Sequence, residues 1–338
     1  MIIVDERELR DAVVMSDVIE RVEGGFASLA RGEVRLPDVL YLDIQEFNGE
    51  VHGKGAHIQG APYFVVKVAA GFYDNPSKDL PVASGLMMVF DATTGHPAGL
   101  LADNGFLTDL RTGAAGAVSV KYMARPELSK VAFVGAGLEA RFQLRALAQV
   151  RKLPAVEVWS RTTETANKFA LEMGAELSCK IDPESELENA VRDADLVVTS
   201  TPSRRPLVHA DWLSRGVHVV AMGSDGPDKR ELASDVLARA DILVADHLEH
   251  CLTHGEIHHG VADGSIRAAD VTAELGDLVA ELAVGRNSPD DITVCDLTGV
   301  GVQDAAVGGL AMERVQARGL GRALSPSSDV EAVGPHLA

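Results

Sequence analysis

The sequence predicts an α/β protein in which a domain of alternating strands and helices is inserted into a mixed α+β domain. Three observations support this. Strand-like and helix-like stretches alternate after residue 129, earlier strands include a hairpin pattern, and a long helical stretch follows the alternating region. We therefore place the inserted domain at residues 121–300 and the surrounding domain at 1–120 plus 301–338.

The surrounding domain reads as a sequence of local patterns, each with its own periodicity. Apolar positions at helical spacing predict an early helix, β-branched and apolar runs predict strands, and two apolar runs flanking a polar, Gly-containing turn predict a hairpin. In chain order these are a helix at 16–33, strands at 36–47 and 61–72, a hairpin at 85–103, and helices at 108–124 and 302–321.

The inserted domain repeats a strand followed by a helix or a polar connection, which is typical of βαβ units and a parallel sheet. Its expected strands are at 130–137, 155–161, 194–202, 216–224, 240–246 and 291–301, with helices at 138–150 and 162–175.

Composition limits the partners. The formal net charge of −19 argues against nonspecific binding to nucleic acid or to an anionic membrane. No apolar run reaches the ~18 residues needed to span a bilayer. The N-terminus lacks the pattern of a signal peptide, and the three cysteines show no CxxC spacing. We expect a cytoplasmic protein without disulfides, with no nucleic-acid or membrane partner.

A glycine motif marks a dinucleotide site. The stretch "VAFVGAGLEA" places Gly135, Gly137 and Ala140 in the G-x-G-x-x-A pattern directly between a strand and a helix. Glycine lets the backbone approach a pyrophosphate closely, and the helix N-terminus offers unpaired N–H groups. The alternative is a tight strand–helix turn without a ligand. We predict a Rossmann-type domain that binds NAD(P), with Ala136 and Leu138 also in contact.

The second strand of that domain bears on which dinucleotide binds. NAD enzymes usually carry an acidic residue at its end for the ribose hydroxyls, but here Ser160, Arg161 and Thr162 occupy that place. They suit a 2′-phosphate, which favours NADP slightly. Arg161 could equally face solvent, so NAD remains open.

Three charged residues are candidates for the chemistry. Lys67 lies inside an apolar strand, where a lysine is costly unless it is paired or faces a cavity; an outward-facing lysine on an edge strand is the alternative. Arg111 is surrounded by small residues and suits a carboxylate clamp. Asp225 follows a predicted strand of the parallel sheet, where α/β enzymes place ligand chemistry.

These stretches together resemble the ornithine cyclodeaminase/mu-crystallin family over nearly the whole chain. The resemblance rests on Lys67 after "YFVV", "DLPVASG", "DNGFLTDLRTGAAGAVS", "VGAGLEA", "SDGPDKREL" and "DLTGVGVQD". It implies a homodimer, in which a Rossmann-type dinucleotide-binding domain is inserted into an α+β substrate-binding and dimerisation domain. It also implies hydride transfer between nicotinamide and an amine or imine carbon next to a carboxylate.

The resemblance also assigns residues. Lys67 and Arg111 would face the substrate's carboxylate and imine, and Thr298 and Gly299 would lie in a loop that closes over the substrate. Asp225 would be the acid/base, and we expect partial burial to raise its pKa. In mu-crystallin-like members a serine replaces the aspartate, so Asp225 favours an enzyme over a binding protein. We further assign to the cofactor site Thr112, Thr201 and Met222.

The sequence departs from the family at "HGKGA". Ornithine cyclodeaminase carries a glutamate and a methionine there, which help to fit the amine of ornithine, whereas this chain has His52 and Lys54. Two like charges about 4 Å apart cost on the order of 4 kcal/mol at intermediate dielectric, so these cations would repel ornithine's second ammonium. They would attract a second carboxylate, as in iminosuccinate. Alternatively, both side chains point to solvent.

We therefore expect an NAD(P)H-dependent imino-acid reductase, an oxidoreductase that acts on a carbon–nitrogen bond, with iminosuccinate to aspartate as the best candidate. Ornithine cyclodeaminase, a redox-neutral ammonia-lyase, is the alternative. A second histidine-rich stretch, 247–259, could align His247, His250 and His254 on one helix face. Because no complete ligand set accompanies it, we predict no metal and a solvated helix end.

Overall fold

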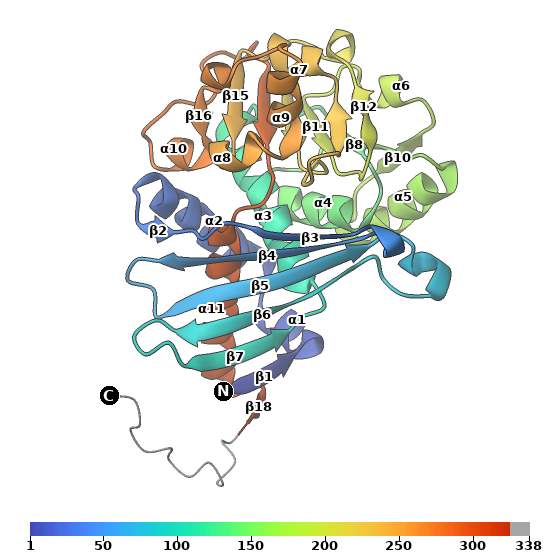
Figure 1. The fold of residues 1–338 in the computed structure, drawn as a ribbon. Helices are drawn as coiled ribbons and strands as arrows, with labels where there is room; N and C mark the ends of the chain where they lie inside the picture. Colours follow the sequence, from blue (N-terminus) through green and yellow to red (C-terminus); the bar gives the residue numbers. More distant parts are fainter. Residues whose placement is uncertain (325–338) are drawn as a thin grey trace, which may run out of the picture.

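The computed structural model describes residues 1–324, so residues 325–338 of the expected surrounding domain lie outside the described residues. Two β-sheets form two layers, one above the other, and helices run between and behind them (Figure 1). No helix among the described residues is both long and apolar enough to cross a membrane.

The lower layer in Figure 1 is a mixed sheet of eight strands. Its order is β18 (Arg322–Ala323), β1 (Ile2–Asp5), β7 (Pro97–Ala102), β6 (Ala83–Asp91), β5 (Tyr63–Phe72), β4 (Gly49–Ile58) and β2 (Val34–Arg35), and β3 (Leu40–Ile44) also pairs with β4. The expected hairpin is confirmed as β6 and β7. Only β1 and β7 run parallel; the other described pairs in this sheet are antiparallel.

Strand β4 is the main difference from the sequence-based expectation, which placed no strand between 36–47 and 61–72. It is a ten-residue strand that pairs with β5 in continuous register. Lys54 lies directly opposite Lys67 in that register, so both side chains project from the same face. His52 and Glu50 follow on this face because side chains alternate along a strand.

The upper layer is a fully parallel sheet of eight strands, as expected. Its order is β10 (Ile181–Glu184), β9 (Ala155–Trp159), β8 (Lys130–Val134), β11 (Leu196–Thr199), β13 (His218–Ala221), β17 (Thr293–Asp296), β15 (Ile242–Ala245) and β16 (Ala273–Glu274). Two further strands pair apart from it, β12 (Arg204–Val208) and β14 (Arg230–Leu232). Chain order reverses between β8 and β11, the switch point at which open α/β sheets bind ligands.

Helices connect the strands and cover the sheets (Figure 1). They are α1 (Glu6–Ala12), α2 (Met15–Ala30), α3 (Phe106–Met123), α4 (Leu138–Val150), α5 (Thr163–Leu177), α6 (Leu187–Val191), α7 (Ser234–Arg239), α8 (Leu248–Cys251), α9 (Gly255–Ala262), α10 (Leu275–Val279) and α11 (Gly301–Arg318). Helix α11 packs on β4 and β5 and against α2 and α3.

Alternate residues of β8 show how the parallel sheet is buried on both faces. Phe133 belongs to the apolar core that continues into the mixed sheet, whereas Ala132 and Val134 belong to a second core on the opposite face. We propose that the upper layer is the domain expected at 121–300, inserted between the strands of the mixed sheet and α11.

Candidate active site

Lys67 is buried and paired. Its Nζ lies 3.1 Å from Oδ1 of Asp304 in α11, and its side chain is 2% exposed. Arg111 in α3 contacts the same oxygen through Nε at 3.2 Å. Two cations from different elements therefore share one fully buried carboxylate, and the edge-strand alternative for Lys67 is wrong.

The local charges perturb this cluster. Burial, together with the nearby charge of Arg111, lowers the pKa of Lys67 to about 7, although Asp304 opposes the shift. Burial would raise the pKa of Asp304, but Lys67 and Arg111 outweigh it and hold that pKa below its ordinary value. Arg111 is also fixed by Gln303, whose Oε1 accepts from Nη1 at 2.6 Å. Among the described residues, neither Lys67 nor Arg111 belongs to the set that lines the cavity between the two layers.

Lys54 faces the same site but is engaged in an unexpected way. Its Nζ donates to the carbonyls of Thr298 at 3.1 Å and Gly299 at 2.8 Å. Buried Asp246 fixes that loop from the other side, accepting from Thr298 Oγ1 at 3.0 Å and Gly299 N at 2.7 Å. Gly299 has φ +80°, and a Cβ there would lie 2.6 Å from Arg111. The structure thus brings the predicted loop and Lys54 together, and Lys54 keeps one N–H free of these bonds.

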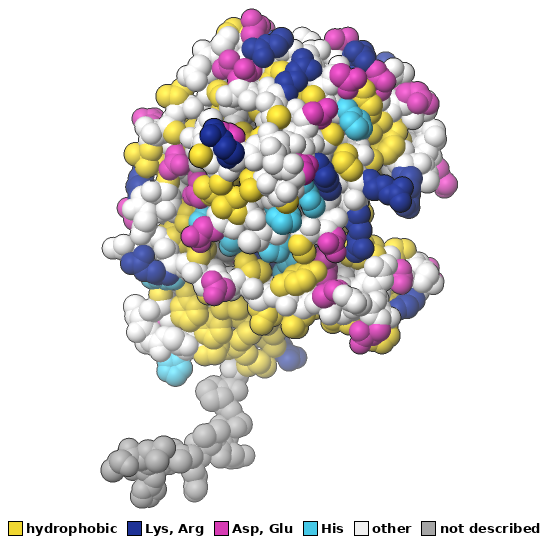
Figure 2. All heavy atoms as spheres, turned by 45° about the horizontal axis from the view of Figure 1, so that its top comes forward, with side chains coloured by type: hydrophobic (Ala, Val, Ile, Leu, Met, Phe, Trp, Pro, Cys, Tyr) yellow, Lys and Arg dark blue, Asp and Glu magenta, His cyan; other side chains and the backbone are white. Residues whose placement is uncertain are grey.

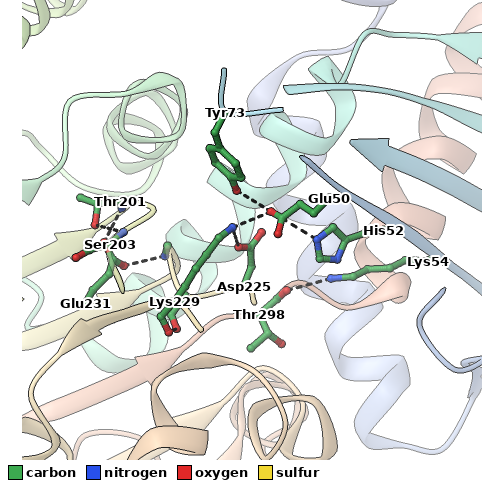
Figure 3. Close-up of polar contacts among 12 residues, drawn as sticks. Glu50, His52, Lys54, Tyr73, Thr201, Ser203, Asp225, Lys229, Glu231 and Thr298 are labelled. Carbon is green, nitrogen blue, oxygen red and sulfur yellow. Dashed lines mark hydrogen bonds and ion pairs between the residues drawn. The ribbon is translucent and has the colours of Figure 1, made fainter. Parts of the chain in front are cut away.

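Asp225 lies across the cleft from β4, in the loop between β13 and β14 (Figure 3). Its Oδ1 accepts from Lys229 Nζ at 2.5 Å, and Lys229 also donates to Glu50 at 2.9 Å. Burial would raise the pKa of Asp225, but the ammonium of Lys229 outweighs it, so the pKa lies below its ordinary value. The expectation of a raised pKa is therefore wrong, and the side chain is a carboxylate at neutral pH.

His52 points toward Glu50, with Nε2 3.8 Å from Oε1 (Figure 3). The His52 side chain is 11% exposed and Nε2 lacks a hydrogen-bond partner among the described residues. The alternative in which His52 and Lys54 point to solvent is wrong, because both line an internal cavity.

That cavity has a volume of about 380 Å³ and opens between the two layers. The predicted residues His52, Lys54, Asp225 and Thr298 line it. Histidines gather near the centre of the face drawn in Figure 2. Of the second stretch, those that line the cavity are His247, His250 and His254. They do not share one helix face, because His247 precedes α8 and His254 precedes α9. Burial lowers the pKa of His250 to about 4.

The glycine loop fits a dinucleotide. Gly135 has φ +113°, and a Cβ there would lie 2.8 Å from the carbonyl of Ser200, so only glycine fits. A Cβ on Gly137 would meet nothing within 4 Å, and Leu138 is 50% exposed. Helix α4 begins after Gly137 with no side-chain cap among the described residues. Its first N–H groups and the space above them suit a pyrophosphate.

The other residues assigned to the cofactor surround this loop. Ser160, Arg161 and Thr162 follow β9, Thr201 follows β11, Met222 follows β13, and Ala136 and Thr112 lie in the loop and in α3. Arg161 is exposed, whereas Thr162 accepts from Thr165 N and so begins α5. Buried Glu231 accepts from Thr201 N at 2.5 Å and from Gly223 N at 2.8 Å, which joins the segments that follow β11 and β13.

Sequence reasoning missed three residues of the site. Asp304 and Lys229 lie inside the quoted stretches "DLTGVGVQD" and "SDGPDKREL", and Glu50 lies two residues before His52. One signal was available, since a buried Lys67 requires a carboxylate partner and Asp304 is the acidic residue in the first turn of α11, directly before an apolar run.

Comparisons with known proteins identify relatives of this chain. Residues 2–319 match the ornithine cyclodeaminase/mu-crystallin family. An uncharacterized cyclodeaminase of Sinorhizobium fredii is 41% identical over 95% of this chain and 98% of its own length. An alanine dehydrogenase of Archaeoglobus fulgidus is 35% identical over 95% of this chain and 97% of its own length. An iminosuccinate reductase of Paracoccus denitrificans is 32% identical over 95% of this chain and 98% of its own length.

Solved structures of related proteins have the same fold over nearly the whole chain. An archaeal alanine dehydrogenase dimer with bound NAD has a TM-score of 0.91 at 34% identity, covering 96% of this chain and 99% of that one. A Δ1-pyrroline-2-carboxylate reductase of Thermococcus litoralis, in complex with NADH and L-proline, has a TM-score of 0.92 at 30% identity, covering 96% and 100%. The expected fold class and the expectation of an NAD-linked oxidoreductase are confirmed. The chain belongs to the ornithine cyclodeaminase/mu-crystallin family.

Proposed function

We propose that this protein is an NAD(P)H-dependent reductase of a small 2-imino acid, with iminosuccinate, reduced to aspartate, as its preferred substrate. The observation that carries the proposal is the buried cluster in which Lys67 and Arg111 share the one carboxylate of Asp304. Two cations for one anion leave the cluster able to hold a second carboxylate, that of the substrate.

Arg111 and Lys67 would bind the α-carboxylate and orient the adjacent imine carbon. Both are rigid, because Gln303 and Asp304 fix the guanidinium and β5 fixes the lysine. A substrate held in this way reacts from one pose, and orientation alone supplies a large share of an enzymatic rate. When bound, the reduced nicotinamide supplies the hydride.

Asp225 would handle charge at the imine nitrogen. As a carboxylate, it stabilises the protonated imine, whose carbon is then a better hydride acceptor. In the reverse direction the same carboxylate accepts a proton from the amino group. This role differs from the general acid that a raised pKa would have implied.

The far end of the cavity supports a second carboxylate on the substrate. Lys54 keeps one N–H, and His52 Nε2 in the same wall, 3.8 Å from Glu50 Oε1, has no hydrogen-bond partner among the described residues. Ornithine cyclodeaminase would need room for a second ammonium near Lys54, and Lys54 stands opposite Lys67, already a like-charge pair. Glu50, the acidic side chain on the same face of β4, pairs with Lys229.

We propose that NADP(H) is accepted as well as NAD(H), with Arg161 holding the 2′-phosphate. Its guanidinium is exposed beside the glycine loop, in the position where an acidic residue would favour NAD. The lean to NADP is slight, because the related structures named above hold NAD or NADH.

We also propose a homodimer that buries the outer face of the mixed sheet. Val66, Val68 and Met88 are 41%, 41% and 36% exposed on that face. Phe64 stacks on Phe90 beside them, with ring centroids 4.8 Å apart. A contiguous apolar face of this kind marks an interaction site. The three free cysteines fit a reducing compartment, and we propose a cytoplasmic enzyme.

A coupled assay tests the proposed function. Oxidation of NADH and of NADPH is followed with a panel of 2-oxo acids plus ammonia, and ornithine with catalytic NAD is assayed in parallel. We expect turnover with oxaloacetate and ammonia together and none with either alone. Proline formed from ornithine without net oxidation of the cofactor would favour the cyclodeaminase, and no turnover with any member of the panel would refute the reductase.

A further inference from the structure

Lys229 bridges the cleft in which the substrate would lie (Figure 3). Its Nζ donates to Asp225 Oδ1 at 2.5 Å and to Glu50 Oε1 at 2.9 Å. The Tyr73 hydroxyl donates to the same Glu50 oxygen at 2.6 Å, and the Tyr73 ring centroid lies 5.3 Å from Nζ. One ammonium thus joins two carboxylates and one aromatic ring.

The partners come from different layers. Asp225 and Lys229 belong to the loop after β13 of the parallel sheet, whereas Glu50 lies on β4 and Tyr73 follows β5 of the mixed sheet. Lys229 is 10% exposed and Glu50 is 13% exposed, so water screens this contact weakly. Asp225 remains 44% exposed toward the cavity.

The backbone of Lys229 is held as firmly as its side chain. The Ser224 hydroxyl donates to the carbonyl of Lys229, which closes the loop on itself. His259 of α9 contacts the same carbonyl through Nε2 at 2.7 Å. Because both ends of the residue are fixed, the position of its ammonium is fixed too.

A metal ion is the competing explanation for this cluster. Glu50, His52 and Asp225 offer ligand atoms within 4.8 Å of one another. The ammonium of Lys229, however, already contacts both carboxylates. A bound cation would have to displace a buried lysine, so the site is built around Lys229.

We propose that Lys229 is a positioning residue for the reaction: it holds the Asp225 carboxylate over the substrate cavity and ties it to Glu50 across the cleft. The inference rests on the proposed function only for the role of Asp225. The bridge itself follows from the contacts.

The bridge has an electrostatic consequence. Burial disfavours its charge, yet Asp225, Tyr73 and Glu50 raise the pKa of Lys229 above its ordinary value. It therefore stays charged and keeps Asp225 ionised. Removing the ammonium leaves two carboxylates facing each other, and the pKa of Asp225 rises.

Three variants test the proposal. Lys229→Met should lower kcat/KM by about 10- to 100-fold at neutral pH, mainly through kcat, and move the acid limb of its pH profile up by roughly one to two pH units. Lys229→Arg keeps the charge and should return the acid limb of the pH profile to its wild-type position. Lys180→Met is the matched control, since Lys180 pairs with Asp182 at 83% exposure and should change neither.

The acid limb is read against every group that faces Asp225. From its own loop this is Lys229, and from the packed elements they are Tyr41, Glu50, His52, Lys54, Tyr73, Glu139 and His254. Apart from Lys229, all are unchanged in the variants, so a shift between wild type and Lys229→Met belongs to the lost ammonium.

A second measurement needs no turnover. Urea midpoints of Lys229→Met, Glu50→Gln and the double variant form a cycle, and we expect the double variant to lose less than the sum of the single losses. Additive losses, or an unmoved acid limb with kcat/KM within threefold of wild type, would overturn the proposal. If the wild type reduces no 2-imino acid, the proposed function fails, while the cycle still decides whether the bridge exists.

Discussion

Asp304 is the residue on which the carboxylate site depends most, so Asp304→Asn is the most informative single change. The substitution keeps the shape of the side chain and removes the charge that Lys67 and Arg111 share. Lys67 Nζ is 3.1 Å from the lost charge. At an effective dielectric of about 20, that pair is worth on the order of 5 kcal/mol, or roughly four pKa units as an upper bound.

The pKa of Lys67 is about 7 with Asp304 in place, and Asp304 is a cause that raises it. In Asp304→Asn the pKa should therefore fall well below 7, and Lys67 becomes neutral across the working range. A carboxylate substrate then loses one charged hydrogen bond, which corresponds to about 10- to 150-fold in kcat/KM.

The pH dependence carries the diagnostic result. Wild-type Lys67 is protonated below pH 7 and loses its proton as pH rises through about 7. The ratio of wild-type to variant kcat/KM should be largest near pH 6 and shrink toward pH 8.5, where Lys67 is neutral in both enzymes. The assay is NADH oxidation with a 2-oxo acid and ammonia; imine formation depends on pH equally for both enzymes and cancels in the ratio.

Asp296→Asn is the matched control. Asp296 is also buried, but burial raises its pKa to about 8, so it is largely protonated at neutral pH and an amide resembles it. We expect kcat/KM within threefold of wild type below pH 7. A ratio for Asp304→Asn that is constant with pH would refute the reasoning, because it would mean that Lys67 does not bind substrate as an ammonium.

Four further changes test other parts of the site. Lys54→Met should raise KM for a dicarboxylate substrate by about 10- to 100-fold more than for a monocarboxylate one. Asp225→Asn should lower kcat by about 10²- to 10⁴-fold while NADH still binds. Gly135→Ala should weaken NADH binding, measured by fluorescence titration, by more than about tenfold, because its backbone conformation is strained for a side chain and its Cβ meets a carbonyl. Arg161→Ala should lower the NADPH-to-NADH ratio of kcat/KM by about tenfold or more.

Each of these has an outcome that contradicts it. Equal losses for both substrate classes would leave Lys54 only its bonds to the loop carbonyls. Turnover retained in Asp225→Asn would show that Asp225 is not the acid/base of the reaction. Gly264→Ala is the control for Gly135, since it shares a positive φ, +78°, but a Cβ there meets nothing. An unchanged NADPH-to-NADH ratio would make Arg161 a solvent-facing cation.

Local signals predicted the parts of the fold that local chemistry decides. The hairpin β6–β7, the strand around Lys67 and the glycine loop before α4 each follow from a few neighbouring residues. Strand β4 was not predicted because glycines at 53 and 55 remove the apolar alternation that marks a strand. It forms because β5 and β3 supply partners on both edges.

The sequence named several residues of the candidate site but few of their contacts. Lys67, Arg111 and Asp225 were identified, yet their partners Asp304 and Lys229 were not. Pairing between distant segments depends on how the layers stack, which periodicity does not encode. The prediction for the pKa of Asp225 was wrong for the same reason. Burial alone would raise this pKa, and only the fold places Lys229 against Asp225.

Deuterium transfer tests the central claim most directly. The enzyme is incubated with oxaloacetate, ammonia and NADH that carries deuterium at both C4 positions. The products are then separated, and their deuterium content is measured by mass spectrometry. We expect aspartate with one deuterium at Cα and no labelled malate. Labelled malate would show reduction of the oxo acid instead of the imine, and unlabelled products would show that no hydride reaches the substrate; either result would contradict the account.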